Sequence, residues 1–566
     1  MKFKKYITVK VALFAAFTLY LSYHAGAQNK RTYNEEVTII APYEPTISDA
    51  FKINHAPNVR DTMKVLPKMR YDITPKLTPM FPPSVPFAAL NFVPDGIQNS
   101  KRFYVRGGAG NYGTLYGELF AGSLPSTRYA ASLRVKHLSS SGKIKDFANP
   151  QNSLNEIEGY ASRFFEEHVL KGNAHYRRSA LHWYGIPSTI EINESRIKQL
   201  FNDYGGEICL ATQNKDKDML NYSLGIAANG LNDNYKTSEL NINVKAGADK
   251  NLYLFGEGQA QNVGLCMNIG HWTQKDSIKT HNSTIVNLQP FLKMKLHHIE
   301  LLLGLNATYA KDTSSTMYFY PKAEARIELI PENLVVFGGF EAGNIRQVSL
   351  LNLYKENPFI SPVLSTGFVK EKYNLQGGIL TKITKSVNVN VYANNIQVEN
   401  YPFFMDNLND YRHTFDLTYD KVNVSKIKAQ IEIVPVDNFQ LAMSGIYNYY
   451  KLDKQPYAWY KPSVQAEFNA RYAFRKSLIV NLQAIYNDKV WAPALIKDPV
   501  NIANPPQLKP TQLDAWLDLS IGGEFRYSKN LSFWLNLNNL TSTQYFHWYN
   551  YPSYKLNLLG GVSYSF

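Results

Sequence analysis

Cysteine is scarce in this chain, since only Cys209 and Cys266 occur among its 566 residues. Two cysteines make no disulfide framework, so the sequence excludes a small disulfide-stapled scaffold. The two thiols can pair in an oxidising envelope. Both lie in strand-like segments, however, and small wall residues of a sheet are the simpler interpretation.

Long apolar runs are also scarce, and the one near the N-terminus extends from Val9 to Leu21. Three lysines precede it, and Ala25-Gly26-Ala27 follows it, as in a secretory signal peptide. We therefore predict a signal peptide over residues 1–27, cleaved between Ala27 and Gln28. A membrane anchor is the alternative, but the run is shorter than the roughly 20 residues that a spanning helix needs. Any further membrane spanning must use strands.

Motifs for catalysis are missing as well. The Gly107-Gly108-Ala109-Gly110 segment lacks the Lys-Ser/Thr of a phosphate-binding loop, and no serine lies in a G-x-S-x-G setting. His297 and His298 are adjacent, so on a strand they point to opposite faces and cannot hold one metal. We expect a non-enzyme without catalytic residues, metal site or cofactor.

The charge is unbalanced but not clustered. The chain has 60 lysines and arginines against 46 acidic residues, a net charge of +14. These cations are spread along the chain and alternate with apolar residues, and no nucleic-acid motif is present, so we expect no nucleic-acid partner. Lipid phosphates, an anionic substrate or an acidic protein are the partners that this charge favours.

Residues 28–100 differ from the rest of the chain. Ten prolines interrupt any regular element there, which predicts an extended and irregular segment. Interspersed apolar residues such as Phe51, Phe81 and Phe87 indicate that the segment packs against something. We interpret it as a periplasmic or lumen-occluding segment.

From residue 101 onward, apolar and polar residues alternate with period two. One face of the final strand is apolar and is formed by Tyr554, Leu556, Leu558, Gly560, Val562, Tyr564 and Phe566. On the opposite, polar face only Leu559 breaks the pattern. Such an apolar face suits a barrel strand in contact with lipid. A second segment opposes Met317 and Phe319 to the charged residues Lys322, Glu324, Arg326 and Glu328, which predicts a lumen row. Pro321 should mark an irregularity near one rim of that strand.

Short polar connectors alternate with longer loops along this region. The connectors include 215–218, 249–251, 297–298, 331–333, 385–386, 437–438, 475–477 and 528–530, and the loops include 141–155, 186–199, 349–370, 400–412 and 492–511. We predict an all-β fold, a transmembrane antiparallel β-barrel of about 22 strands over residues 101–566. The short turns and the C-terminus would lie on the periplasmic side of the outer membrane.

Aromatic residues gather near the predicted outer strand ends: Tyr401, Phe403, Phe404, Trp459, Tyr460, Trp491, Phe546, Trp548 and Tyr549. We expect most of them to anchor the barrel at the membrane interface. A surface for a sugar, a peptide or a partner is the alternative.

The last 60 residues carry a more specific pattern. Leu535-Asn536-Leu537-Asn538-Asn539-Leu540, an aromatic group, and the ending Gly560-Gly561-Val562-Ser563-Tyr564-Ser565-Phe566 resemble the closing hairpin of TonB-dependent outer-membrane receptors. The resemblance implies that Tyr564 and Phe566 form the signal read by the barrel-assembly machinery. It also implies a plug domain before the barrel, yet residues 28–100 are too short and too rich in proline for one. The chain therefore looks like a plug-less relative.

A short element near the predicted mature N-terminus, Glu36-Val37-Thr38-Ile39-Ile40, resembles the energy-coupling box of these receptors. Such a box adds as a strand to a periplasmic energy-coupling partner. A local β-segment docked on the barrel is the simpler interpretation of the same residues.

Taken together, these patterns predict a transport channel, or the channel subunit of an envelope complex with a gating partner. A structural scaffold in an outer-membrane export or assembly machine is the alternative. In either case outer-membrane lipids surround the barrel. The alternation of apolar and polar residues does not indicate which substrate is transported.

Overall fold

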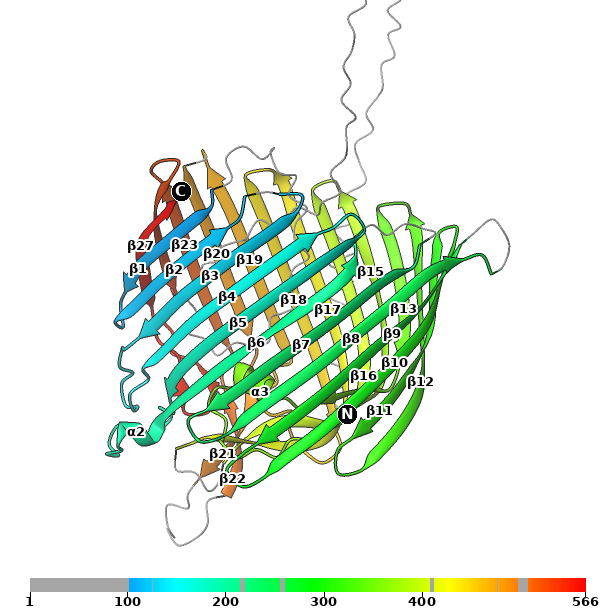
Figure 1. Cartoon of the computed structure of the whole chain (residues 1–566). Coiled ribbons are helices and arrows are strands. Elements are labelled where there is room, and N and C mark those ends of the chain that lie inside the picture. Colours follow the sequence, from blue (N-terminus) through cyan, green and yellow to red (C-terminus); the bar gives the residue numbers. More distant parts are fainter. Residues whose placement is uncertain are drawn as a thin grey trace, which may run out of the picture. The chain divides into compact units, whose positions relative to one another are not determined.

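The computed structural model describes residues 101–124, 126–213, 219–254, 260–407, 412–475, 477–496 and 507–566, and these form a closed antiparallel barrel (Figure 1). The predicted signal peptide, the Pro-rich segment 28–100 and the candidate energy-coupling box Glu36–Ile40 lie outside the described residues. Within the described residues, no helix is both long enough and apolar enough to cross a membrane.

The barrel has 22 strands, as predicted, because β13 and β14 both pair with β15 and are two parts of one position in the wall. The strands of the wall are β1 (Phe103–Gly110), β2 (Thr114–Gly122), β3 (Tyr129–Ser140), β4 (Asn152–Phe164), β5 (His168–His182), β6 (Lys198–Thr212), β7 (Asn221–Asp233), β8 (Ser238–Leu252), β9 (Gln261–Lys275), β10 (Thr280–Leu296), β11 (Ile299–Lys311), β12 (Ser315–Ile330), β13 (Leu334–Glu341), β14 (Asn344–Gln347), β15 (Phe368–Thr384), β16 (Val387–Asp406), β17 (Phe415–Val436), β18 (Phe439–Leu452), β19 (Val464–Phe474), β20 (Leu478–Asn487), β23 (Trp516–Arg526), β24 (Leu531–Asn538) and β27 (Asn557–Ser565).

The remaining described elements belong to the connections. They are two helices, α2 (Glu194–Ile197) and α3 (Leu350–Glu356), and two small hairpins, one of β21 (Val490–Ile496) with β22 (Gln507–Leu513) and one of β25 (Phe546–Trp548) with β26 (Tyr551–Pro552). The alternating apolar residues from Leu513 to Tyr527 are divided between two elements, since Leu513 ends β22 and the wall resumes at Trp516.

The barrel closes between its first and last strands, where β1 pairs with β27 in continuous register. Gly108 lies opposite Gly561, and a side chain at Gly561 would collide with the carbonyl oxygen of Gly107. Glycine is required at this seam because the two backbones approach so closely. The glycines of 107–110 are thus strand residues and not part of a phosphate-binding loop. Phe103 stacks on the terminal Phe566 with ring centroids 5.2 Å apart.

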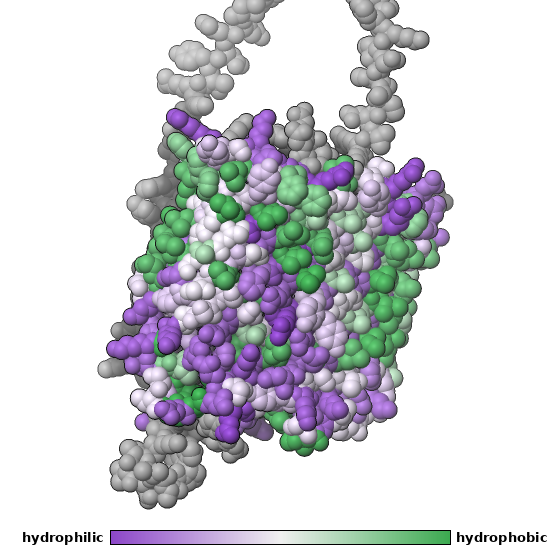
Figure 2. Space-filling model, turned by 60° about the vertical axis from the view of Figure 1, so that its left-hand side comes forward, coloured by the Kyte–Doolittle hydropathy of each residue, from purple (hydrophilic) through white to green (hydrophobic). Residues whose placement is uncertain are grey.

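The outer surface confirms the alternation of the last strand. Leu558, Val562 and Phe566 are 42%, 48% and 55% exposed, as lipid-facing side chains must be in the absence of a membrane. Leu559, the residue that breaks the pattern, is fully buried on the inner side against Trp534 and Tyr116. Figure 2 shows apolar residues gathered on the upper part of one outer face and hydrophilic residues towards its lower rim.

The two rims differ in their connections. The turns at 297–298, 331–333, 385–386, 437–438 and 528–530 lie between strands as predicted, on the rim that also carries the C-terminus. The prediction of a turn at Asp249–Asn251 is wrong, because β8 runs on to Leu252. The long connections with α2, α3 and the β21–β22 hairpin lie at the other rim (Figure 1). Short turns are typical of the periplasmic side, which makes the long loops extracellular.

Pro321 does mark an irregularity, although in the middle of its strand. Pairing between β12 and β13 begins at Lys322, the residue directly after Pro321, whose ring leaves no N–H donor. Beyond Gly343, which has a φ of 72°, the chain continues as β14. Ile345 of β14 packs against Ile285 of β10 and Ala310 of β11, so this segment crosses the inner side of the wall.

The cysteines and the adjacent histidines were the other residues considered from the sequence. Cys209 on β6 and Cys266 on β9 are free thiols. His297 and His298 occupy an exposed turn, as expected.

Candidate functional site: the lumen beneath a loop cap

The outer end of the barrel contains a buried aromatic core made by loops. We use the name loop cap for the connections 183–197, 348–367, 453–463 and 539–556 together with the β21–β22 hairpin. Its most deeply buried side chains, with the strand ends that they contact, are Trp183, Ile186, Ile197, Phe359, Ile360, Phe403, Phe404, Phe415, Trp459, Tyr460, Ala492, Trp548 and Tyr551. Loops that bury this much apolar surface pack as a core.

The rings of the cap meet one another closely. Tyr551 stacks on Phe359 with centroids 3.7 Å apart, and its hydroxyl donates to the carbonyl oxygen of His413 at 3.0 Å. Trp548 lies edge-on to Phe404 at 5.1 Å and contacts Tyr460 at 4.7 Å. Aromatic pairs at these separations stabilise a contact beyond the area that they bury.

The predicted role of these aromatic residues as interface anchors is wrong for the buried ones. Phe403, Phe404 and Trp548 are at most 3% exposed. Side chains that contact headgroups must face outward, whereas these lie in the core of the cap. Trp548 belongs to a connection that turns inward, whereas Phe403 and Phe404 lie at the end of β16 where the cap packs against the wall, and alternation along a strand records neither.

Helix α3 fixes the cap to the wall through a first carboxylate, Glu239 of β8. The backbone N–H of Leu350, in the first turn of α3, donates to Glu239 Oε2 at 2.6 Å, and the hydroxyl of Ser349 donates to Oε1 at 2.5 Å. Ser349 is also the N-cap residue of α3, accepting from the N–H of Asn352. A carboxylate at this position satisfies helix N–H groups that have no partner within the helix.

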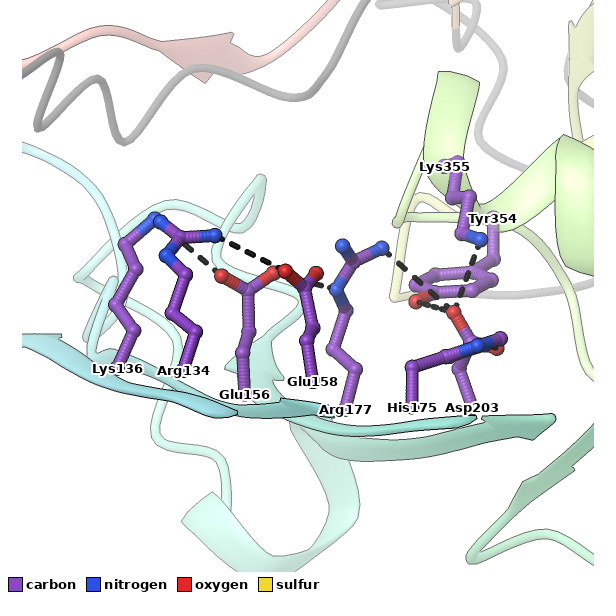
Figure 3. A network of polar contacts seen from close by, with 9 residues as sticks. All are labelled: Arg134, Lys136, Glu156, Glu158, His175, Arg177, Asp203, Tyr354 and Lys355. Atoms are coloured by element: carbon purple, nitrogen blue, oxygen red, sulfur yellow. Dashed lines mark hydrogen bonds and ion pairs between the residues drawn. The ribbon is translucent and has the colours of Figure 1, made fainter. Parts of the chain in front are cut away.

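A second carboxylate, Asp203 of β6, receives the other end of α3. Lys355 Nζ lies 2.9 Å from Asp203 Oδ2, and the Tyr354 hydroxyl donates to the same oxygen at 3.4 Å. From the wall, His175 Nε2 and Arg177 Nη1 approach the carboxylate at 3.1 and 3.6 Å. Figure 3 shows Lys355 and Tyr354 reaching from α3 to Asp203 while the others rise from the strands. Asp203 is fully buried, so these contacts take the place of water around its carboxylate.

The network continues along the wall to β3 and β4 (Figure 3). Arg177 Nε lies 2.6 Å from Glu156 Oε1, and Lys136 Nζ lies 3.4 Å from Glu156 Oε2. Arg134 bridges Glu118 at 2.8 Å and Glu158 at 3.2 Å. Cations therefore pair with carboxylates from β2 to β6.

A third polar contact joins two loops of the cap. Lys461 Nζ lies 2.6 Å from Glu356 Oε1 at the end of α3. Burial by itself lowers the pKa of an ammonium group, but the facing carboxylate outweighs it, and the pKa of Lys461 is raised above its usual value. Burial, with Asp203 nearby, also raises the pKa of Tyr354, so its hydroxyl stays protonated and able to donate.

Between the cap and the inner wall lies a cavity of about 900 Å³. Six cationic side chains line it against three carboxylates, namely Lys136, Arg177, Lys355, Lys426, Lys428 and Lys461 against Glu156, Glu356 and Glu467. Its aromatic lining includes Phe359, Tyr460 and Trp548 of the cap. Such a cavity suits a small solute with negative charge and an apolar part. No group of three or more potential metal ligands occurs in the described part of the chain.

Few of the residues singled out from the sequence meet in this site. Tyr564 and Phe566 lie on the outer face of β27 in the closing seam, 46% and 55% exposed, and the assembly role of these two stays a prediction. Ala27, Gln28 and the Glu36–Ile40 element lie outside the described residues. Asp203 and Glu239 were missed. The alternation of β6 and β8 predicts that both side chains point into the barrel. Their partners on α3, however, are more than a hundred residues away in the sequence.

Comparisons with known proteins agree on the fold. No protein-family model and no curated protein matches the sequence. Among solved structures, the FrpB iron transporter of Neisseria meningitidis is 10% identical with a TM-score of 0.62, over 83% of this chain and 82% of that one. The pyoverdine outer membrane receptor FpvA of Pseudomonas aeruginosa is 13% identical with a TM-score of 0.60, over 83% and 79%. The ferric-catecholate import receptor Fiu of E. coli K12 is 12% identical with a TM-score of 0.59, over 83% and 82%.

At this identity the likeness concerns the fold. It agrees with the closing hairpin of the sequence, with the strand number and with the apolar outer surface. A closed barrel of this kind is the form in which strands cross a membrane. The protein is an outer-membrane β-barrel with the fold of the TonB-dependent receptors.

Proposed function

We propose that the protein is a transport channel of the outer membrane that its own loop cap closes on the extracellular side. The observation that carries this proposal is the attachment of α3 to the inner wall. Two buried carboxylates, Asp203 and Glu239, hold the helix above a cavity lined with charged residues. The cap packs as one core, and the loss of its polar attachments to the wall can release it without unfolding the barrel.

The solved neighbours support transport over catalysis, because their names describe receptors and an iron transporter. The charged groups of this network also fit a non-enzyme, since Glu156, Glu158 and Asp203 are each paired with a cation. We further propose that the chain works without a globular plug, with residues 28–100 as a second closure. The Glu36–Ile40 element would then contact a periplasmic energy-coupling partner.

A scaffold in an export or assembly machine remains the second candidate. The tightly packed aromatic core of the cap favours it, because a core of this kind also suits a permanent seal. The two functions differ in one property. A channel must open when its closures are removed, whereas a scaffold need not.

Conductance in planar bilayers tests this difference. Four proteins are compared: the mature chain, the chain lacking residues 28–100, the cap variant Asp203→Asn/Glu239→Gln, and the combination of both changes. We expect the intact chain to stay closed and the combination to give large steady conductance. The two single changes report which closure is tighter.

The matched control is Glu324→Gln/Glu328→Gln, which neutralises two carboxylates of the predicted lumen row on β12, outside the cap and the cavity. It should conduct like the intact chain. Heat-dependent migration on gels verifies that each barrel is folded. A folded combination variant that stays closed would contradict the channel and favour the scaffold.

A further inference from the structure

Two lysines of the cavity differ from the other four cations. Lys426 and Lys428 lie two residues apart on β17 and both line the cavity, while Ile427 between them is 51% exposed on the outer surface. Among the described residues, neither ammonium group has an ion pair or a hydrogen bond. Lys136, Arg177, Lys355 and Lys461, in contrast, each pair with a carboxylate.

The neighbouring strand provides no counter-charge. Asn448 and Ile446 of β18 lie opposite the two lysines in register, and both line the cavity as neutral residues. Glu467 of β19 is the lining carboxylate on this side. Its Oε1 accepts from Asn469 Nδ2 at 2.9 Å and from Gln483 Nε2 at 3.3 Å, and although its negative charge acts on Lys428, no ion pair joins these two side chains.

Two ammonium groups on one face of a strand repel each other, because residues i and i+2 are only about 6.6 Å apart. Within a confined cavity with low-dielectric walls the field of such a pair is focused rather than dispersed. A bound anion removes the repulsion and supplies the missing hydrogen-bond acceptors. The two unpaired lysines add nothing to the stability of the folded protein, whereas they would stabilise a bound anion.

We propose that the cavity is a binding site for a small multivalent anion, held by Lys426 and Lys428. The ligand class is an organic solute with two or more carboxylate or phosphate groups. Its size is limited by the cavity of about 900 Å³, and its apolar part would contact the rings of Tyr460 and Trp548. The entry of this solute into the cell rests on the proposed transport function, but its binding does not.

Titration calorimetry on the full mature protein in detergent tests the site, with citrate as the carboxylate probe and inorganic pyrophosphate as the phosphate probe. The variant Lys426→Gln/Lys428→Gln should bind the preferred probe at least about tenfold more weakly, because each lost charge-assisted hydrogen bond is costly. The conservative variant Lys426→Arg/Lys428→Arg should retain most of the affinity. The probe that binds more tightly identifies the oxyanion.

The control variant is Lys245→Gln/Lys293→Gln, which removes the same charge from β8 and β10, outside the cavity. It should bind like the unchanged protein. Equal weakening in both variants would reduce the effect to the general positive charge and overturn the proposal. Unchanged binding in Lys426→Gln/Lys428→Gln would overturn it as well, and so would the absence of binding to either probe, both in the intact chain and in the released cap variant.

This result is independent of the channel test. Lysine-dependent binding by a barrel that never conducts would retain the anion site and contradict transport. Conductance without lysine-dependent binding would support transport and contradict the anion site.

Discussion

Two regions of the inner wall use the same residue types in opposite ways. Along β3 to β6, cations and carboxylates alternate in space, and Asp203 and Glu156 are each surrounded by cationic donors. On β17, Lys426 and Lys428 face neutral neighbours. The first region holds α3 in place, whereas the second leaves its charge available.

The comparison teaches that a charged lumen row has no single meaning. Where both signs meet at 2.6 to 3.6 Å, the charges belong to the structure, because removing one of them leaves its partners without a counter-charge. Where two cations of one strand lie beside a cavity without an ion pair, their charge stays available to a ligand. Only contacts in space distinguish the two cases.

The largest effect is expected when the paired region is broken at its centre. Asp203→Asn leaves Arg177 and Lys355 facing a neutral side chain in a buried site, which should weaken the attachment of α3 by about 3–5 kcal/mol. Limited proteolysis of the loop 348–367 measures the release. The control Glu324→Gln should leave the cleavage rate unchanged, and equal rates in Asp203→Asn and the unchanged protein would contradict the role of Asp203.

A smaller effect is expected at the contact between loops. Lys461→Met removes a charge-assisted hydrogen bond to Glu356 and should loosen the cap by about 1.5–3 kcal/mol, read from the same cleavage rate. The contact also predicts a pH dependence. Because the folded pKa of Lys461 is raised, its contribution is complete below the ordinary lysine value of about 10.4 and is lost only as the pH rises through the raised pKa.

We therefore expect a contribution that is constant between about pH 7 and 10 and declines in stronger alkali. Lys461→Met should lack this alkaline component of cap release. A difference between the two proteins that already vanishes near neutral pH would contradict the assignment.

A further variant tests the comparison by adding a carboxylate beside the two lysines of β17. Asn448→Glu places a carboxylate opposite Lys426 on the neighbouring strand. Cross-strand pairs of opposite charge contribute about 0.2–1 kcal/mol, so the barrel should become slightly more stable. The same change should abolish binding of the anionic probe. Urea unfolding and calorimetry measure the two effects, and probe binding that survives the new carboxylate would argue against the site.

The smallest change in stability is expected from Lys426→Gln/Lys428→Gln. Neither lysine has a carboxylate partner among the described residues, so the free energy of unfolding should stay within about 0.5 kcal/mol of the unchanged protein. A loss comparable to that of Asp203→Asn would show that the lysines are structural after all.

Much of the wall is predictable because its rule is local. Period two assigns Leu558 to lipid and Lys322 to the lumen without knowledge of any other strand. The turn at residues 437–438 follows from the polar residues between two alternating segments. Even Leu559, which breaks the pattern, is informative, since its apolar side chain marks a place where the inner face is packed.

The cap was not predictable in the same way. Phe403 and Trp548 have the composition of interface residues, and nothing nearby in the sequence indicates that they turn inward. Tyr354 and Asp203 are 151 residues apart, and their contact depends on the curvature of the closed barrel.

The sequence by itself determined a barrel of about 22 strands with a lipid-facing exterior and a charged interior, because strand alternation and turn chemistry act over a few residues. The tertiary structure alone decided which charges are paired, which remain available and that the loops fill the outer end. Those outcomes depend on distances across the lumen, and such distances exist only once β27 has closed on β1.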